Sequence, residues 1–325
     1  MPRFDLAPVK SFNFGFDFDE AAFNSFLAKA RLDLDSVPEQ VLYDLGCGKL
    51  AGRSFVINNA GVLFFAREPQ RIVRNSFVEC FRFQGNTRGN IVDNKKLVGN
   101  LASLVDQGEA FVKRHSRLAY KFDGFNRINI EEYPYKAIKE AIVNAVCHRD
   151  YLAQNNVSIH VFDDRVEVIS PGNIPNGLTL KDVEGKSNPR NFTIFDLFKR
   201  IDYVERAGSG LKRMREEMIM HGLDNPRFEA NKAFFTATFF GPKDKILDLV
   251  QPSNVLDLRS LGLNERQIKA LGLAFNENKV FSNEEYRKVF RVSRQTASRD
   301  LTELVKQDML KEEGGSKYVS YKAKR

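Results

Sequence analysis

A carboxylate and an amide that could serve a nucleotide site lie four residues apart. Glu140 and Asn144 occur in a periodic segment, residues 135–147, that is predicted to be a helix. Side chains four positions apart on a helix share one face. The carboxylate could therefore orient a water molecule while the amide oxygen helps to hold Mg²⁺. The alternative is a solvated polar face on an amphipathic helix, and this segment alone favours that alternative.

Two glycine-containing loops follow this helix. Gly172 and Gly177 flank a proline-rich turn, where backbone could approach a ligand closely. Gly208-Ser209-Gly210 precedes a helix expected over residues 211–221. A glycine turn at a helix N-terminus presents backbone N–H groups to an anion, and the helix dipole adds to the attraction. Each loop alone is a weak signal, whereas the order of helix, first loop and second loop is much more specific.

The C-terminal segment is basic and contains side chains of the types that proteins use to read DNA. Residues 255–325 hold 15 Lys+Arg and 10 Asp+Glu, a net charge of 15 − 10 = +5, within a chain whose net charge is 50 − 42 = +8. A helix expected over residues 293–307 begins with hydroxyl, amide and guanidinium groups that suit base edges and phosphates. We therefore favour DNA binding over a protein-contact role. The candidate DNA-binding residues are Ser293, Arg294, Gln295, Thr296, Ser298 and Arg299 on this helix and Lys317 on the following wing.

Composition narrows the class of protein. The 325 residues suffice for two or three domains, and 28 Phe indicate a real hydrophobic core. No apolar run approaches the roughly 18–20 residues that span a bilayer, so we expect no membrane association. Three widely separated Cys argue against a disulfide framework or a zinc site. We expect a cytoplasmic protein, and its basic balance weakly favours a polyanionic partner.

The predicted fold class is α+β, in three domains. Residues 1–130 are expected to form a mixed α/β module for scaffolding or dimerisation, with helices over 19–30, 38–45 and 93–115. Apolar segments 54–65 and 76–83 are predicted strands, the first alternatively a strand followed by the start of a helix.

Residues 131–243 are expected to form a second domain. After the helix over 135–147 come two strands of a hairpin, 157–162 and 165–170, and helices over 191–200 and 211–221. Closing strands are predicted over 228–230 and 234–240. This order predicts an α/β sandwich with its helices on one face of a mainly antiparallel sheet.

Residues 255–325 are expected to form a winged helix-turn-helix. Helices are predicted over 264–276, 282–290 and 293–307, followed by strands over 309–312 and 318–322. Asn264 is the expected cap of the first helix, and Ser282 with Glu285 forms a capping box for the second. Winged-helix readers often pair on two-fold DNA sites, so we expect a homodimer that binds duplex DNA.

Four runs of sequence resemble the Bergerat-fold (GHKL) ATPases. They most closely resemble the branch of transcriptional regulators labelled as related to the C-terminal part of the ATP-dependent DNA helicase RecG. The resemblance covers about residues 1–240, and the runs are EAIVNAVCHRDY at 140–151, SPGNIPNG at 170–177, NPRN at 188–191 and ERAGSGL at 205–211. Members of this branch typically carry an N-terminal Schlafen-like AlbA domain, which we expect to be absent, because the chain begins at what looks like the family's middle region. The helicase label does not imply a motor, since no P-loop motif occurs in the sequence.

The resemblance implies ATP and Mg²⁺ as cofactors and gives roles to individual positions. Glu140 matches the general base and Asn144 the Mg²⁺ ligand. The remaining nucleotide-binding positions are Gly172 in the first loop, Arg190 in the lid region, and Gly208, Ser209, Gly210 and Leu211 in the second loop. The sequence departs from the family at Ser170, which stands where GHKL proteins use an aspartate to read the adenine amino group.

Three functions are consistent with these features. The first is a nucleotide-responsive, DNA-binding transcriptional regulator. The alternatives are an ATPase whose hydrolysis is the output, and a degenerate dimeric scaffold that binds DNA without nucleotide. The presence of both Glu140 and Asn144 argues against the scaffold, while Ser170 argues for it. We favour the regulator over the enzyme because the sequence predicts an output module but no substrate domain.

Overall fold

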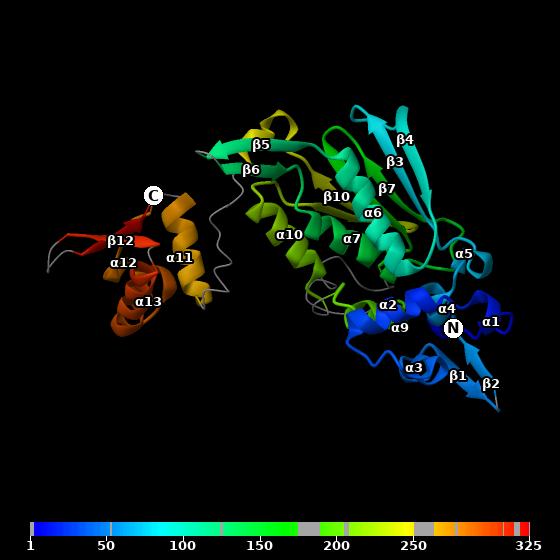
Figure 1. Cartoon of the computed structure of the whole chain (residues 1–325). Helices are drawn as coiled ribbons and strands as arrows, with labels where there is room; N and C mark the ends of the chain where they lie inside the picture. Colours follow the sequence, from blue (N-terminus) through cyan, green and yellow to red (C-terminus); the bar gives the residue numbers. More distant parts are fainter. Residues whose placement is uncertain are drawn as a thin grey trace. The chain divides into compact units, whose positions relative to one another are not determined.

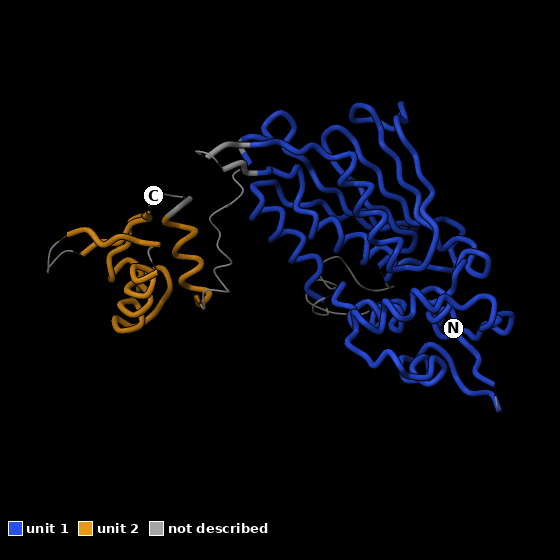
Figure 2. The backbone as a smooth tube through the Cα atoms, viewed as in Figure 1, with its two compact units in different colours: residues 1–251 blue, residues 252–325 orange. Residues whose placement is uncertain are grey.

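The structure, a computed structural model, forms two compact units, Met1–Gln251 and Pro252–Arg325 (Figure 2). It describes residues 3–52, 54–123, 126–174, 189–204, 208–249, 263–276, 279–307, 309–314 and 319–324. Each unit has its own hydrophobic core and is considered separately.

The first unit opens with short helices around a phenylalanine-rich cluster. Phe23, Phe26, Phe64 and Phe65 contact one another through their ring edges, an arrangement that aromatic rings favour. The segment predicted as a strand and the start of a helix is confirmed in that form, with Asn58 as the helix cap. The elements are η1 (Phe4–Leu6), α1 (Phe14–Asp17), α2 (Glu20–Ala30), α3 (Pro38–Asp44), β1 (Gly48–Ala51), β2 (Ser54–Ile57), α4 (Asn59–Phe65) and α5 (Pro69–Ile72).

A six-stranded sheet forms the centre of the first unit. Its order is β4-β3-β7-β8-β10-β9, and every pair of neighbours is antiparallel except β3 and β7, which are parallel. The α+β class and the mainly antiparallel sheet are therefore confirmed. The strands are β3 (Val78–Gln84), β4 (Asn90–Leu97), β7 (Val157–Val161), β8 (Arg165–Pro171), β9 (Arg227–Ala230) and β10 (Phe234–Phe240).

Three helices, α6, α7 and α10, lie on one face of this sheet (Figure 1). The stripe predicted on the 135–147 segment is confirmed, since Ala137, Ile138, Ala141, Ile142 and Ala145 are all buried. Burial of such a stripe against the sheet supplies most of a helix's stability in a protein. The remaining elements of this unit are α6 (Leu101–His115), β5 (Leu118–Asp123), β6 (Asn126–Glu131), α7 (Tyr135–His148), α9 (Phe192–Arg200), α10 (Gly210–Met220) and η2 (Lys243–Asp248).

The long helix predicted over residues 93–115 is wrong in its first part. Strand β4 continues to Leu97, which is paired with Val78 of β3 and is 1% exposed. Gly99 then takes a positive φ of 125°, and the Asn100 side chain caps α6 by accepting from the Ser103 N–H. The glycine and the cap stop the strand and start the helix. The hairpin of β5 and β6 was not anticipated from the sequence.

The sheet joins the two segments that the sequence analysis separated at residue 130. Strands β3 and β4 come from the 1–130 range, whereas β7 to β10 come from the 131–243 range. One continuous cluster of buried apolar residues runs through both ranges. The predicted boundary therefore lies inside a single compact unit.

The second unit packs three helices on a three-stranded sheet of order β11-β13-β12. The predicted capping box of Ser282 and Glu285 is confirmed, and Asn264 accepts hydrogen bonds from the N–H groups of Arg266 and Gln267. The elements are α11 (Glu265–Asn276), β11 (Phe281–Ser282), α12 (Asn283–Phe290), α13 (Arg294–Lys306), β12 (Leu310–Glu313) and β13 (Ser320–Ala323).

Candidate functional site

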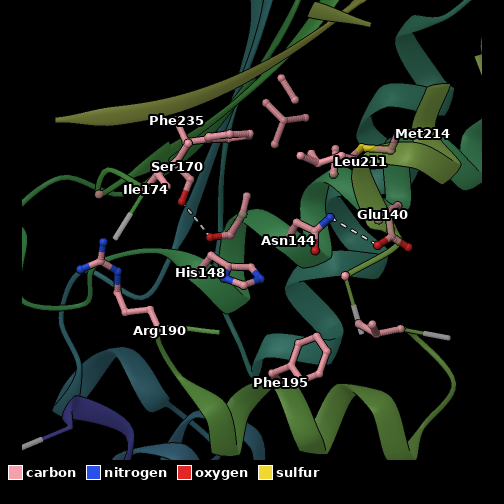
Figure 3. Close-up of a pocket in the computed structure, with 18 of the residues that line it drawn as sticks. Glu140, Asn144, His148, Ser170, Ile174, Arg190, Phe195, Leu211, Met214 and Phe235 are labelled. Carbon is pink, nitrogen blue, oxygen red and sulfur yellow. Dashed lines mark hydrogen bonds between the residues drawn. The ribbon is translucent and has the colours of Figure 1, made fainter. Parts of the chain in front are cut away.

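A pocket in the first unit collects most of the side chains that the sequence predicted to bind nucleotide (Figure 3). Helix α7 supplies one wall, the start of α10 a second, and strands β8 and β10 the sheet side. Apolar groups make up much of the lining, which suits a flat aromatic base. The lining residues include Val168, Phe195, Val204, Leu211, Met214, Phe235 and Ala237 beside the polar groups described below.

Glu140 and Asn144 lie together on the pocket face of α7. Glu140 is buried, with 7% of its surface exposed, so this face is not the solvated polar face considered as the alternative. The Asn144 Nδ2 group donates to Glu140 Oε1 at 3.3 Å. Because the amide nitrogen is directed at the carboxylate, Oδ1 of the same amide remains available as an acceptor or a cation ligand.

The start of α10 comes close to these two side chains. A Cβ atom on Gly210 would lie 2.6 Å from Glu140 Oε1 and 2.9 Å from Asn144 Nδ2, so any side chain at position 210 would displace these two groups. Gly208 has a φ of +84°, which favours glycine, and it lines the pocket together with Leu211. Ser209 is the N-cap of the helix, and its side chain makes no capping hydrogen bond. The glycine turn thus brings a helix N-terminus against the carboxylate and the amide.

Gly172 is required by its backbone and by its surroundings. Its φ is +106°, and an added Cβ would lie 3.0 Å from the Asp150 nitrogen and 3.5 Å from Arg190 Nη2. The Asp150 N–H donates to the Pro171 carbonyl at 2.8 Å, which holds the end of β8 against the residues that follow α7. Pro175, Asn176 and Gly177 of the same predicted loop lie outside the described residues.

Ser170 is a buried pocket residue with a fixed hydrogen-bond direction. Its hydroxyl donates to the Ala145 carbonyl of α7 at 2.8 Å. A hydroxyl has one proton and two lone pairs. With the proton directed at Ala145, the Ser170 oxygen can only accept toward a ligand, as the carboxylate of an aspartate does.

Arg190 lines the pocket on the side away from Glu140 (Figure 3). Its Nη2 donates to the Asn173 carbonyl at 2.7 Å, and its Nη1 lies 3.8 Å from Asp150 Oδ2. The guanidinium therefore braces the Gly172 turn. Glu205, Arg206 and Ala207 of the fourth matching run lie outside the described residues.

His148 is a pocket residue that the sequence analysis missed. It lies one helical turn after Asn144, so the spacing of residues 140, 144 and 148 on one face contained the signal for it. Its ring lies 6.4 Å from that of Phe195. Burial, together with the positive charge of Arg190, lowers the pKa of His148 from 6.5 to about 4. The imidazole is therefore neutral at physiological pH, with one donor and one acceptor nitrogen.

Arg149 builds the site without lining it. The side chain is buried, and it donates to the carbonyls of Asn75 at 2.6 Å and Asn155 at 2.8 Å. Its guanidinium also stacks 4.6 Å above the Tyr151 ring. Burial lowers the pKa of Arg149. Residues 140–151 therefore have two roles. Those on α7 line the pocket, and Arg149, just after α7, joins neighbouring loops by hydrogen bonds.

The residues predicted to contact DNA lie together at the start of α13 in the second unit. Arg294, Gln295 and Arg299 are exposed, while Ala297 and Leu301 on the opposite face are buried. The other three predicted residues also have partners within the unit: Ser293 caps the Thr296 N–H at 3.1 Å, and Ser298 accepts from Asn283 Nδ2 at 2.8 Å. Lys317 lies outside the described residues.

The described residues bear on two of the expectations, those for a membrane and for a metal ion. Within them, no helix is long and apolar enough to cross a membrane. The same part of the chain contains no cluster of three or more His, Cys, Asp or Glu that could hold a metal ion.

Comparison with known proteins supports the nucleotide-binding interpretation for part of the chain. Residues 154–239 match the family model described as "Putative ATP-dependent DNA helicase recG C-terminal". A search of curated proteins found no match. Among solved structures, the DIP2311 protein from Corynebacterium diphtheriae is similar, with a TM-score of 0.65 and 20% identity over 99% of this chain. The chain spans 64% of the length of that protein, and at this identity the likeness shows the fold alone.

The family match and the pocket overlap. Ser170, Gly172, Gly208 and Gly210 lie inside the matched range, whereas Glu140 and Asn144 precede it on α7. The structure brings both groups of residues to one pocket. Residues 154–239 thus resemble the RecG C-terminal-related ATPase domain, and the preceding helix completes the pocket of that domain.

Proposed function

We propose that the pocket binds ATP with Mg²⁺ and that the second unit binds duplex DNA, which makes the protein a nucleotide-responsive transcriptional regulator. The observation that carries the proposal is the meeting of Glu140, Asn144 and Gly210 at the N-terminus of α10. A helix N-terminus attracts phosphate. The carboxylate and the amide beside it supply a proton acceptor and a metal ligand.

The pocket residues fit Mg²⁺ and a triphosphate at this end. Asn144 would hold the metal through Oδ1, the oxygen that points away from Glu140. The bound metal would neutralise phosphate charge. Because Gly210 has no Cβ, the N-terminus of α10 would bind the phosphates directly beside Glu140 and Asn144, and Glu140 is placed to hold and orient a water molecule.

The opposite end of the pocket fits the base. Ser170 presents an acceptor oxygen, because its proton is directed at Ala145, and an exocyclic amino group is the complementary donor. Adenine carries such a group at C6, whereas hypoxanthine carries a carbonyl oxygen there. Ser170 therefore favours ATP over ITP, and its replacement of an aspartate does not by itself argue for a scaffold that binds no nucleotide.

The second unit supports the DNA-binding part of the proposal. Three helices and the β12–β13 hairpin match the element order of a winged helix-turn-helix, with α13 in the place of the recognition helix. Arg294, Gln295 and Arg299 are exposed at its start. A homodimer would place two such helices on a two-fold DNA site.

A calorimetric titration of the full chain tests the nucleotide site. We expect wild type to bind ATP more tightly with Mg²⁺ than in EDTA, and ATP more tightly than ITP. Glu140→Gln should retain binding and lose any hydrolysis, whereas Asn144→Ala should lose the gain in affinity that Mg²⁺ provides. Hydrolysis by wild type would favour the ATPase as the alternative output.

One result would reject the nucleotide site altogether. If wild type shows no Mg²⁺-dependent affinity for ATP, the degenerate scaffold is the better description. A normal thermal unfolding transition in the same sample would exclude misfolding as the reason.

A further inference from the structure

Arg213 contacts Glu140 from outside the pocket. It lies one turn after Gly210 on α10, and its Nη2 group forms an ion pair with Glu140 Oε2. The Arg213 side chain is 24% exposed and that of Glu140 8% exposed. Arg213 is not among the residues that line the pocket. Its contact with Glu140 links Arg213 to the pocket.

The two oxygens of Glu140 have different partners. Oε2 accepts from Arg213, while Oε1 accepts from Asn144 Nδ2 at 3.3 Å. A buried polar group needs such partners to replace its lost hydration. The ion pair with Arg213 and the hydrogen bond from Asn144 hold the Glu140 carboxylate in one rotation.

The orientation of the Asn144 amide depends on this carboxylate. Glu140 Oε1 accepts from the amide N–H₂ group, and the reverse orientation of the amide would place two oxygens together. Oδ1 then points away from Glu140, where it can meet a cation. The contacts thus run in one direction, from Arg213 through Glu140 to the oxygen of Asn144.

Close packing of the two helices keeps this chain of contacts together. Gly210 allows α10 to approach α7 until only a hydrogen atom fits between its Cα and the Glu140 carboxylate. Met214 and Met218 on the same side of α10 are buried. This packing holds the backbone of α10 close enough to α7 for the Arg213 side chain to reach Glu140.

We propose that Arg213 is a positioning residue for the metal ligand Asn144, acting through Glu140. The inference rests on the proposed binding of Mg²⁺–ATP and names the group that prepares the site for the metal. Outer partners of metal ligands typically contribute about 10- to 100-fold to metal affinity. Arg213 should accordingly affect the Mg²⁺-dependent part of ATP binding and leave the metal-independent part unchanged.

The experiment compares ATP affinity in Mg²⁺ and in EDTA for the full chain. Arg213→Gln should reduce the Mg²⁺-dependent gain about tenfold or more, with affinity in EDTA close to that of wild type. Arg213→Lys keeps the positive charge. The increase in ATP affinity that Mg²⁺ gives this variant should lie between the increases for wild type and for Arg213→Gln. The matched control is Lys212→Gln, which removes a charge from the adjacent, exposed residue that pairs with Glu216 at 3.5 Å, and it should bind as wild type does.

The outcomes separate this inference from the function on which it rests. A wild-type chain with no Mg²⁺-dependent affinity overturns both. If wild type shows the gain, an unchanged gain in Arg213→Gln overturns the role of Arg213 alone, as does an equal loss of affinity in Mg²⁺ and in EDTA. Should Arg213→Gln not fold, Arg213→Lys decides: a reduced gain supports the role, and a gain equal to that of wild type rejects it.

Discussion

Gly210 and Gly272 show one residue type in two different surroundings. A Cβ on Gly210 would lie within 3 Å of both Glu140 and Asn144, whereas a Cβ on Gly272 of α11 would have no atom within 4 Å. Gly272 lies inside helix α11, where its φ is negative, so alanine can adopt the same backbone conformation. Replacement by alanine should therefore disturb the pocket at Gly210 and meet no obstacle at Gly272.

Gly210→Ala should weaken ATP binding about tenfold or more, because the methyl group displaces the carboxylate and the amide that hold the metal and its water. The measurement is a titration with Mg²⁺–ATP, with the midpoint of thermal unfolding recorded beside it. Unchanged affinity would show that Glu140 and Asn144 do not contact the nucleotide.

Gly272→Ala should stabilise the second unit by about 0.5–1 kcal/mol. Alanine restricts the unfolded chain and favours helix, and its methyl group meets no steric obstacle at this position. Denaturant unfolding of the full chain measures the change, and a loss of stability would contradict the open surroundings of Gly272.

Among the secondary-structure elements, helix α7 both packs against the sheet and supplies polar side chains to the pocket. Its apolar stripe faces the sheet, and its polar residues at positions 140, 144 and 148 face the pocket. Among them, His148 has a pKa well below its usual value. The pH dependence of stability should therefore report on the last turn of this helix.

His148→Gln should flatten the stability profile between pH 6.5 and pH 4. The wild-type folded state keeps His148 neutral down to its pKa of about 4, while the unfolded chain takes up a proton near pH 6.5. Wild type therefore loses stability as the pH falls through this window, by up to about 1.4 kcal/mol per pH unit. Denaturant unfolding at a series of pH values measures how the free energy of unfolding changes with pH in wild type and in His148→Gln. Equal slopes for the two proteins between pH 6.5 and pH 4 would contradict the lowered pKa of His148.

Glu167 provides an internal control at lower pH. Burial alone would raise its pKa, but His160, Arg165 and Arg88 outweigh burial and lower it from 4.5 to about 2. Stability from this carboxylate is present above pH 4.5 and is lost toward pH 2. That loss should be the same in wild type and in His148→Gln.

The residues of the candidate pocket were more predictable than the sheet that supports them. Glu140, Asn144 and the glycines were found because helical spacing and glycine turns are local properties of the sequence. Arg213 was missed because its contact with Glu140 joins two helices separated by the intervening strands and loops. Leu97 was assigned to a helix because its apolar side chain fits either period, and only its pairing with Val78 decides for the strand.

In the molecule as a whole, one compact unit contains the proposed nucleotide pocket and the other contains the exposed side chains that we propose to read DNA. Each unit has its own core. In the second unit, helices α12 and α13 are capped by Ser282 and Ser293 of the same unit. The proposed regulator therefore has one compact unit for ATP and another for DNA.

DNA binding by the full chain should weaken steeply with salt, because phosphate contacts release counterions. Arg294→Gln should lower the slope of log affinity against log salt by about one if the guanidinium meets a phosphate, or relax preference at one base pair if it reads a base. Lys212→Gln in the first unit is the control of equal charge and should leave the slope unchanged. Fluorescence anisotropy with a labelled duplex measures both, and absence of binding at low salt would assign α13 to protein contacts.

The parallel pairing of β3 with β7 also has a consequence for synthesis on the ribosome. The edge of β3 that faces away from β4 stays open until β7 emerges, and the chain between them runs from Gln84 to Val157. At about 5–20 residues per second, translation of that stretch takes roughly 4–15 s. During this interval the nascent chain presents an unpaired strand edge, which is a template for incorrect pairing. Slow codons between these two positions would lengthen the exposure, so the yield of folded protein depends on the pace of translation there.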